Sequence, residues 1–144
     1  MPKIDFYLII EQTENERLRF ACRLLDKAYQ QNHQVYVHVA NESDANTFNN
    51  LLWTFRDISF VPHDLVGGKN SENTPILIGF DNKPENTNDI LLNLDHQIPD
   101  FFTKFERVVE IVSQDKELQK KARENYSYYK EQGFKIETHD LRRK

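Results

Sequence analysis

The chain has 144 residues, of which 38% are hydrophobic and 29% charged, and its formal net charge is −4 at pH 7. This length corresponds to one domain, here residues 1–144, that can bury its own core without metals or disulfides. The negative balance argues against a protein that coats nucleic acid through a basic field, although a local basic patch stays possible. No apolar run is long enough to span a membrane, and the N-terminus lacks the basic-then-apolar order of a signal peptide. We therefore expect a soluble protein.

The sequence has one cysteine, Cys22, which falls on the apolar face of the first predicted helix. A single cysteine cannot form an internal disulfide, and this fits a reducing compartment. We expect a buried, reduced thiol and a cytoplasmic protein.

The first half of the chain alternates predicted strands and helices. Residues 5–10 form a continuous apolar run, which is typical of a strand buried on both faces. Thr13 and Glu16 have the spacing of a capping box, so a helix follows and runs to about residue 31. A second strand over residues 34–39 leads to a second helix. The order strand, helix, strand, helix requires crossover connections and therefore a parallel sheet.

The second predicted helix has a cap at Asn41 or Ser43 and ends near Arg56. The remaining predicted elements are a strand-like piece over 59–61 ended by Pro62, strands over 76–80, 90–94 and 105–112, a helical turn at 101–102, a helix from about Asp115 to Gly133, and a short edge strand over 134–137. Polar stretches at 66–75 and 81–88 indicate loops, and residues 141–144 a frayed basic tail. These elements predict a single Rossmann-like α/β domain with a mostly parallel sheet of about five strands, flanked by helices.

Little in the sequence indicates catalysis. The four glycines build neither G-x-G-x-x-G nor a P-loop, so a phosphate-binding turn is not expected. The five histidines lack the i, i+4 spacing of a helical zinc site, and we predict neither a metal nor a cofactor. The alternative is a small α/β hydrolase or nucleotide-binding protein with its site at the carboxyl ends of the strands, where Glu11, Asn41 and His63 would be the candidates.

Trp53 is misplaced on the second predicted helix. The apolar residues of this helix share one face, and they are Ala45, Phe48, Leu51, Leu52 and Phe55. Trp53 falls on roughly the opposite side. An indole there is either covered by a neighbouring loop or offered to a partner, and the pattern leaves both open.

The last predicted helix carries a basic stripe. Spacings of four and three residues place on one side Lys116, Lys120, Arg123, Ser127 and Lys130. A solvated basic face is the simpler interpretation. However, Tyr126 lies at the edge of the apolar face, one helical turn from Arg123. A guanidinium and a phenol bordering one groove would suit an acidic peptide that ends in an aromatic residue with a free carboxylate.

Several stretches together resemble the chi subunit family of the bacterial DNA polymerase III holoenzyme. They are Asp5–Leu8, Leu52–Phe55, Phe60–Leu65, Asp89–Leu94, Phe105–Val112 and Ala122–Tyr126, the last leading to Gly133 and Phe134. No single motif is unique, but the joint pattern is specific and covers nearly the whole chain. The resemblance implies a Rossmann-like fold without a nucleotide site, and a non-catalytic accessory role in the clamp-loader complex.

The resemblance also implies two partners at two surfaces. Trp53, Phe60 and Pro62 match the surface used for the psi subunit, which tethers the family to the clamp loader. Some members offer that surface to a repair helicase as well. Arg123 matches the family arginine needed for the acidic C-terminal tail of single-stranded DNA-binding protein (SSB). DNA would then be reached indirectly, through SSB.

For the SSB tail, Val112 and Tyr126 stand at neighbouring matched positions. Gln119 and Ser127, however, stand where the best-known members have basic residues. This departure leaves two alternatives: a weaker tail site, or one that depends on Lys116, Lys120 and Lys130. The ending Arg142-Arg143-Lys144 also differs from the family, and we assign it no role. Direct binding of single-stranded DNA through the last helix is disfavoured by the net charge and by too few exposed aromatic residues.

Overall fold

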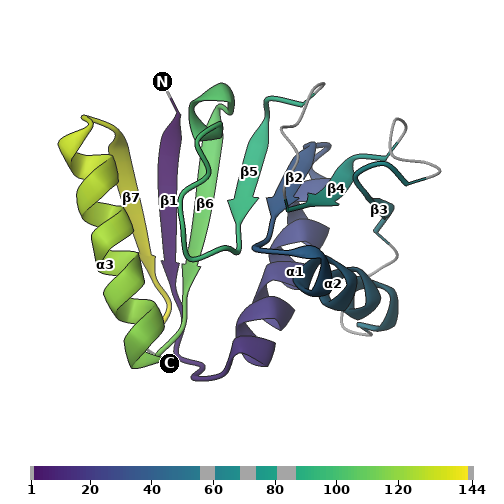
Figure 1. Ribbon diagram of the computed structural model, residues 1–144, viewed down its shortest axis with the longest axis horizontal. Helices are drawn as coiled ribbons and strands as arrows, with labels where there is room; N and C mark the ends of the chain where they lie inside the picture. Colours follow the sequence, from purple (N-terminus) through teal and green to yellow (C-terminus); the bar gives the residue numbers. More distant parts are fainter. Residues whose placement is uncertain (1, 56–60, 69–73, 81–86, 143–144) are drawn as a thin grey trace.

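The computed structural model describes residues 2–55, 61–68, 74–80 and 87–142. Within these ranges all strands belong to one sheet (Figure 1). The strands are β1 (Lys3–Leu8), β2 (Val35–His38), β3 (His63–Leu65), β4 (Ile76–Gly79), β5 (Ile90–Asn93), β6 (Arg107–Val112) and β7 (Lys135–Asp140). The helices are α1 (Glu14–Gln30), α2 (Glu42–Thr54) and α3 (Lys116–Glu131), with a 3-10 turn η2 (Phe102–Lys104).

The strand order is β3-β4-β2-β5-β6-β1-β7, and all the pairings are parallel. The Rossmann-like α/β prediction is therefore confirmed. The sheet has seven strands, more than the five or so that we predicted. The two strands beyond those five lie at the edges of the sheet. β7, predicted as a short edge strand over 134–137, runs from Lys135 to Asp140 and is largely exposed, and β3 is short and has no strong apolar pattern.

The helices begin where the sequence predicts. The side chain of Thr13 accepts a hydrogen bond from the Glu16 amide at 3.1 Å, and that of Asn41 accepts one from the Asp44 amide at 2.8 Å. Asp115 caps α3 in the same way. Such caps satisfy amide groups that have no partner inside the helix. After α3 the chain turns through Gly133, whose φ of +86° is the left-handed conformation that glycine adopts at low cost.

The predicted strand-like piece over 59–61 is only partly testable, because Ser59 and Phe60 lie outside the described residues. Val61 and Pro62 are not in a strand, and β3 begins at His63 instead. Proline lacks the amide hydrogen that a ladder needs, so pairing with β4 starts after Pro62 rather than before it. Val61, the part of the predicted piece that the structure describes, is therefore not in a strand, contrary to our prediction.

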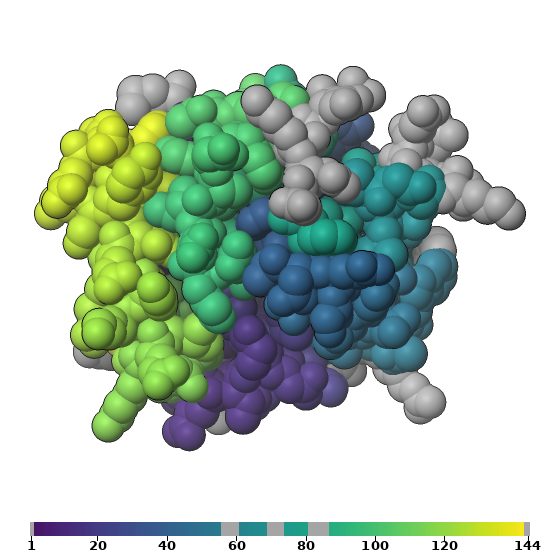
Figure 2. Space-filling model, in the orientation of Figure 1, coloured from purple at the N-terminus to yellow at the C-terminus, as the bar shows by residue number. Residues whose placement is uncertain are grey.

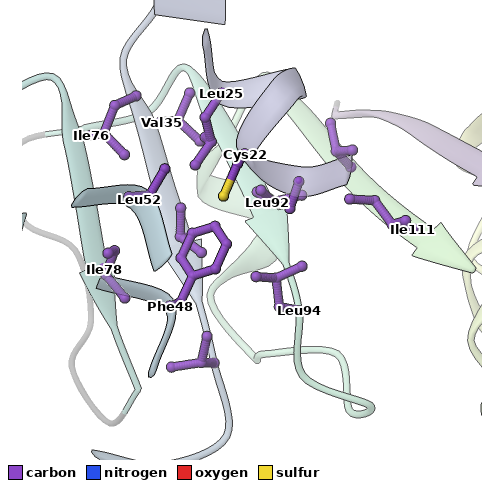
Figure 3. Close-up of a cluster of buried hydrophobic side chains, with 14 of the residues drawn as sticks. Cys22, Leu25, Val35, Phe48, Leu52, Ile76, Ile78, Leu92, Leu94 and Ile111 are labelled. Carbon is purple, nitrogen blue, oxygen red and sulfur yellow. The ribbon is translucent and has the colours of Figure 1, made fainter. Parts of the chain in front are cut away.

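The sheet is buried on both faces by separate clusters. On one face α1 and α2 pack against inward-pointing strand residues, and Figure 3 shows Cys22 and Leu25 of α1 and Phe48 of α2 facing those side chains. Cys22 is fully buried, as predicted, and burial raises the pKa of its thiol to about 12. On the other face α3 and η2 cover a second cluster that includes Phe6, Val112 and Tyr129.

The two edges of the sheet form opposite ends of the molecule. Figures 1 and 2 show α3 and β7 at one end, and α2 with β3 at the other. Because the basic stripe lies on α3 and Trp53 on α2, the two predicted interaction sites are carried by opposite ends of the fold.

Two candidate interaction surfaces

The two flanks of α3 face different neighbours. On one flank, Asn125 donates a hydrogen bond from Nδ2 to the carbonyl oxygen of His96 at 3.0 Å. On the other flank, the ring of Tyr126 meets the ring of Phe6 edge-on, with 5.4 Å between the centroids. Phe6 belongs to β1, which lies between β6 and β7. The Tyr126 flank of α3 is therefore the flank that faces β7.

Exposed cations gather on this flank and beside it. We call Lys116, Lys120, Arg123, Tyr126 and Lys130 the α3 basic surface. Its four cations are exposed, and none of them forms an ion pair with a carboxylate of the described residues. By contrast, Lys121 on the other flank lies 3.8 Å from Glu124. Arg123 thus presents a guanidinium without a charge partner from the described chain.

Apolar residues lie next to these cations. Tyr126 is 36% exposed, and Val112, at the end of β6, is 8% exposed. Leu8 pairs with Val112 across the sheet and belongs to the same cluster as Ala122, the neighbour of Arg123 in the chain. Val112 and Ala122 also line one small pocket, together with Lys121 and Asn125 of the other flank. Val112 therefore lies beneath α3 next to Ala122, whereas Arg123 and Tyr126 are on the flank that faces β7, with Lys120 and Lys116 on the preceding turns of the helix.

Gln119 has a structural contact of its own. Its side-chain amide donates to Oε1 of Gln114 at 3.3 Å, and Gln114 in turn donates to the carbonyl oxygen of Ile9 at 3.0 Å. This short chain of hydrogen bonds ties the start of α3 to the end of β1. Ser127 is exposed and adds no charge.

The second surface surrounds Trp53, which is 56% exposed near the end of α2. Its ring centroid lies 4.6 Å from that of His63, and the planes are inclined by 52°. His63 is itself buried, with Nδ1 2.7 Å from the carbonyl oxygen of Val61. Trp53 and His63 together with the half-buried Pro62 form what we call the Trp53 surface. Phe60, predicted to belong to it, lies outside the described residues.

The residues of the alternative enzyme site are not brought together. Glu11 and Asn41 follow the carboxyl ends of β1 and β2, but His63 is the first residue of β3 and pairs with Ile76, the first residue of β4. In a parallel sheet the amino ends of all strands lie on one side and the carboxyl ends on the opposite side. His63 therefore lies at the amino ends, away from Glu11 and Asn41 at the carboxyl ends. Asn41 is also engaged as the cap of α2. The three residues proposed for a hydrolase or nucleotide-binding site therefore do not form one site.

Comparison with known proteins agrees with this geometry. Residues 1–137 match the family described as DNA polymerase III chi subunit, HolC. The chain belongs to this chi subunit family. It is 36% identical over 143 residues to a DNA polymerase III subunit chi from Pseudomonas aeruginosa, with 99% of each chain covered. It is also 30% identical over 138 residues to the subunit from Haemophilus influenzae and 29% identical over 143 residues to that from Escherichia coli, with at least 95% of each chain covered.

This chi-family protein has two buried polar clusters that the sequence did not predict. In the first, Oε2 of Glu110 accepts hydrogen bonds from the Tyr129 hydroxyl at 2.7 Å and from Nδ2 of Asn93 at 3.0 Å. Burial raises the pKa of Glu110 to about 7. The cluster lies beneath α3 and joins the helix to two strands, so it supports the helix that carries the basic surface.

The second cluster surrounds Asp5 in β1, whose side chain is fully buried. Burial acts to raise its pKa, but hydrogen bonds from Arg107 and His139 outweigh burial and leave the pKa below its ordinary value. Asp5, Glu137 and His139 bring three possible metal-ligand atoms within 4.8 Å of one another. However, Asp5 already pairs with Arg107, and Glu137 pairs with Lys3. Because side-chain cations neutralise both carboxylates, we do not propose a metal site here.

None of the helices within the described ranges combines the length and the hydropathy that crossing a membrane requires.

Proposed function

We propose that this chi-family protein is a non-catalytic adaptor of the bacterial replicase, which links the clamp-loader complex, through the psi subunit, to the C-terminal tail of SSB. The observation that carries the proposal is Arg123: its guanidinium has no carboxylate partner in the described chain and lies one helical turn from Tyr126, an exposed aromatic residue of the same helix. A surface of this kind suits an anionic peptide better than a substrate, because it offers charge and apolar contact but no nucleophile and base.

At the α3 basic surface, Arg123 would bind the terminal carboxylate of the SSB tail. Two parallel N–H···O bonds from a guanidinium give both strength and orientation. Val112 and Tyr126 would contact the aromatic end of the tail. Lys116, Lys120 and Lys130 would attract its acidic residues from a greater distance, so they should speed association more than they raise affinity.

At the Trp53 surface, the exposed indole would be the main contact for psi. Tryptophan is enriched among residues that dominate interface energies, and burying the exposed part of this ring in a complex would release water from a large apolar area. Pro62 and Phe60 would extend the contact. A repair helicase could use the same surface, in which case it would compete with psi.

The positions of the two surfaces at opposite ends of the molecule support simultaneous binding. The adaptor would then work through linkage of contacts that are individually weak. A bound SSB offers several tails, which raises the effective concentration of tail around each site. In this proposal DNA is reached only through SSB, and the protein acts in the cytoplasm with the replicase.

The tail site is tested by calorimetric titration with a synthetic SSB tail peptide. We expect micromolar binding, which corresponds to about −8 kcal/mol. Arg123→Ala should weaken it by roughly 1.5–3 kcal/mol, the usual contribution of a hydrogen bond to a charged group. Lys121→Ala is the matched control, because it removes a cation from the other flank of the same helix. Equal loss in both variants, or none in Arg123→Ala, would place the tail elsewhere.

The psi site is tested with Trp53→Ala. Removal of a central aromatic residue should weaken psi binding by about 2 kcal/mol or more, and should leave binding of the tail peptide unchanged. Tyr128→Ala is the control, because Tyr128 is also an exposed aromatic residue but lies on α3, at the opposite end. Unchanged psi binding by a folded Trp53→Ala variant would reject this assignment.

A further inference from the structure

A cleft of about 170 Å³ at the carboxyl end of α1 belongs to neither of the two candidate surfaces. Its floor begins with the first residues of three neighbouring strands, because Val35 pairs with Ile90 and Ile90 pairs with Arg107. Leu92 and Val109 form the next row of the floor, since they are paired and each lies two residues further along its strand. The cleft therefore lies at the amino ends of the strands, on the face of the sheet that α1 covers.

The roof of the cleft is formed by the last turns of α1. Leu24, Ala28 and Gln31 are spaced by four and three residues, and Lys27 lies one helical turn after Leu24, so all four are on the side of the helix that borders the cleft. Ala28 is half-buried at the centre of this set. The methyl group of Ala28 leaves space that a larger side chain would occupy.

The polar residues that line the cleft include two cations. Nε of Arg107 donates to Asp5, which leaves the two Nη groups of the guanidinium without an acceptor among the described residues. Lys27 is exposed and forms neither an ion pair nor a hydrogen bond with the described part of the chain. None of the described lining residues is acidic, although the whole chain has a net charge of −4. The cleft is thus positive in a protein that is negative as a whole.

The carboxylates that contact lining residues already have hydrogen-bond partners. Asp5 accepts from Arg107, and the other oxygen of its carboxylate lies 2.9 Å from Nε2 of His139. Oδ2 of Asp89 lies 2.9 Å from Nδ1 of His33 and also accepts from the amide of Gln34. Lys27 is therefore the lining charge that no described carboxylate balances.

We infer that this cleft is a binding site for a small aromatic carboxylate. The apolar floor would take the ring, while Lys27 and the Nη groups of Arg107 would bind the carboxylate. An engineered apolar cavity of about 150 Å³ binds benzene, so this cleft has room for one ring. The site is separate from the α3 basic surface, because α1 and α3 cover opposite faces of the sheet. The inference goes beyond the adaptor function and does not depend on it.

The test is titration of the ¹⁵N-labelled protein with phenylacetate, followed by NMR. We expect saturable shifts of amide signals from the residues that line the cleft. Phenylacetamide, which has nearly the same shape but no charge, should bind about tenfold more weakly because it loses the charge-assisted hydrogen bonds. Equal binding of the two compounds, or no saturable shift at the cleft, would overturn the inference.

Two variants of α1 separate the roles of space and charge. Ala28→Leu should fill the cleft and weaken binding more than tenfold, with circular dichroism used to confirm that the variant is folded. Lys27→Ala should weaken binding about twofold to fivefold, since an exposed charge contributes modestly, and the loss should shrink as salt is added. Lys121→Ala is the matched control, because it removes a lysine from α3 on the opposite face of the sheet. Full affinity in a folded Ala28→Leu variant, or in Lys27→Ala, would contradict the proposed site.

A competition experiment distinguishes this site from the proposed tail site. The synthetic SSB tail peptide should leave bound phenylacetate in place, because the peptide is expected at α3. Displacement of phenylacetate by the peptide would assign the cleft to the tail and overturn the inference of a separate site. The tail site itself is tested through Arg123→Ala, so either proposal can fail without the other.

Discussion

Glu110 should make the stability of this protein depend on pH in an unusual direction. The carboxyl is 5% exposed, and burial raises its pKa from 4.5 to about 7. The folded state therefore retains a proton that the unfolded chain has lost above pH 4.5. The stability associated with this group is fully present below the unfolded pKa and is lost as the pH rises through the folded pKa, near 7.

The size of this effect follows from the shift. A difference of 2.5 pKa units between the folded and unfolded carboxyl corresponds to about 3 kcal/mol in full, of which about 2–3 kcal/mol falls between pH 5 and pH 8. Glu110→Gln keeps the shape and an oxygen that can accept from Tyr129 and Asn93, but it cannot ionise. We expect the variant to gain stability relative to the wild type by this amount as the pH rises from 5 to 8.

The assay is urea unfolding, followed by circular dichroism at several pH values, with the slopes compared to ensure that the same surface is exposed. Glu131→Gln, which removes an exposed carboxyl from the end of α3, is the control and should follow the wild type. If Glu110→Gln and the wild type run parallel between pH 5 and pH 8, the buried carboxyl titrates at its ordinary pKa and the reasoning is refuted.

Three further predictions concern the rest of the fold. Phe48→Ala should lower the free energy of unfolding by about 3–5 kcal/mol, since Phe48 is fully buried between α2 and the sheet, whereas Thr47→Ala on the exposed side should cost far less in the same urea experiment. Cys22 should react with a thiol reagent only as fast as the protein opens, because the thiol is buried and its pKa is raised to about 12; rapid labelling of the native protein at pH 8 would contradict this. The pKa of Asp5 is lowered in the folded state, so the advantage of the wild type over Asp5→Asn should be present at neutral pH and disappear as the pH falls below the ordinary range of aspartate, and an advantage that persists in acid would speak against it.

The local signals in the sequence predicted the helices and most of the strands. Thr13 and Asn41 cap their helices, and Gly133 allows the turn after α3, because caps and turns depend on residues close together in the chain. Local reasoning failed at Pro62. There the apolar run before proline looked like a strand, but pairing with β4 decided where the strand begins.

The buried polar clusters could not be predicted, because their partners are distant in sequence. Asp5 is held by Arg107 and His139, which lie 102 and 134 positions away. Glu110 is likewise satisfied by a tyrosine on a different element. In the sequence, these residues simply interrupt apolar runs. The register of the sheet brings each cluster together.

The candidate surfaces show the same division. The helical spacing of the basic stripe and the misplaced position of Trp53 could be read directly from the sequence. The pattern left open whether Trp53 is covered, and the structure shows that it is exposed. The end of the chain could not be read in this way. We predicted a frayed tail, but the amide of Leu141 donates to the carbonyl oxygen of Leu8 at 2.8 Å and Arg142 pairs with Asp140, so residues 141–142 are held in place.

The most direct test of the adaptor account is whether psi and the SSB tail bind at the same time. A fluorescently labelled tail peptide would be titrated with the protein alone and with the protein saturated with psi, and its anisotropy recorded. We expect equal affinity in both titrations and a higher final anisotropy with psi, because a ternary complex is larger. Displacement of the peptide by psi would show that the two partners share one site, and would contradict the account.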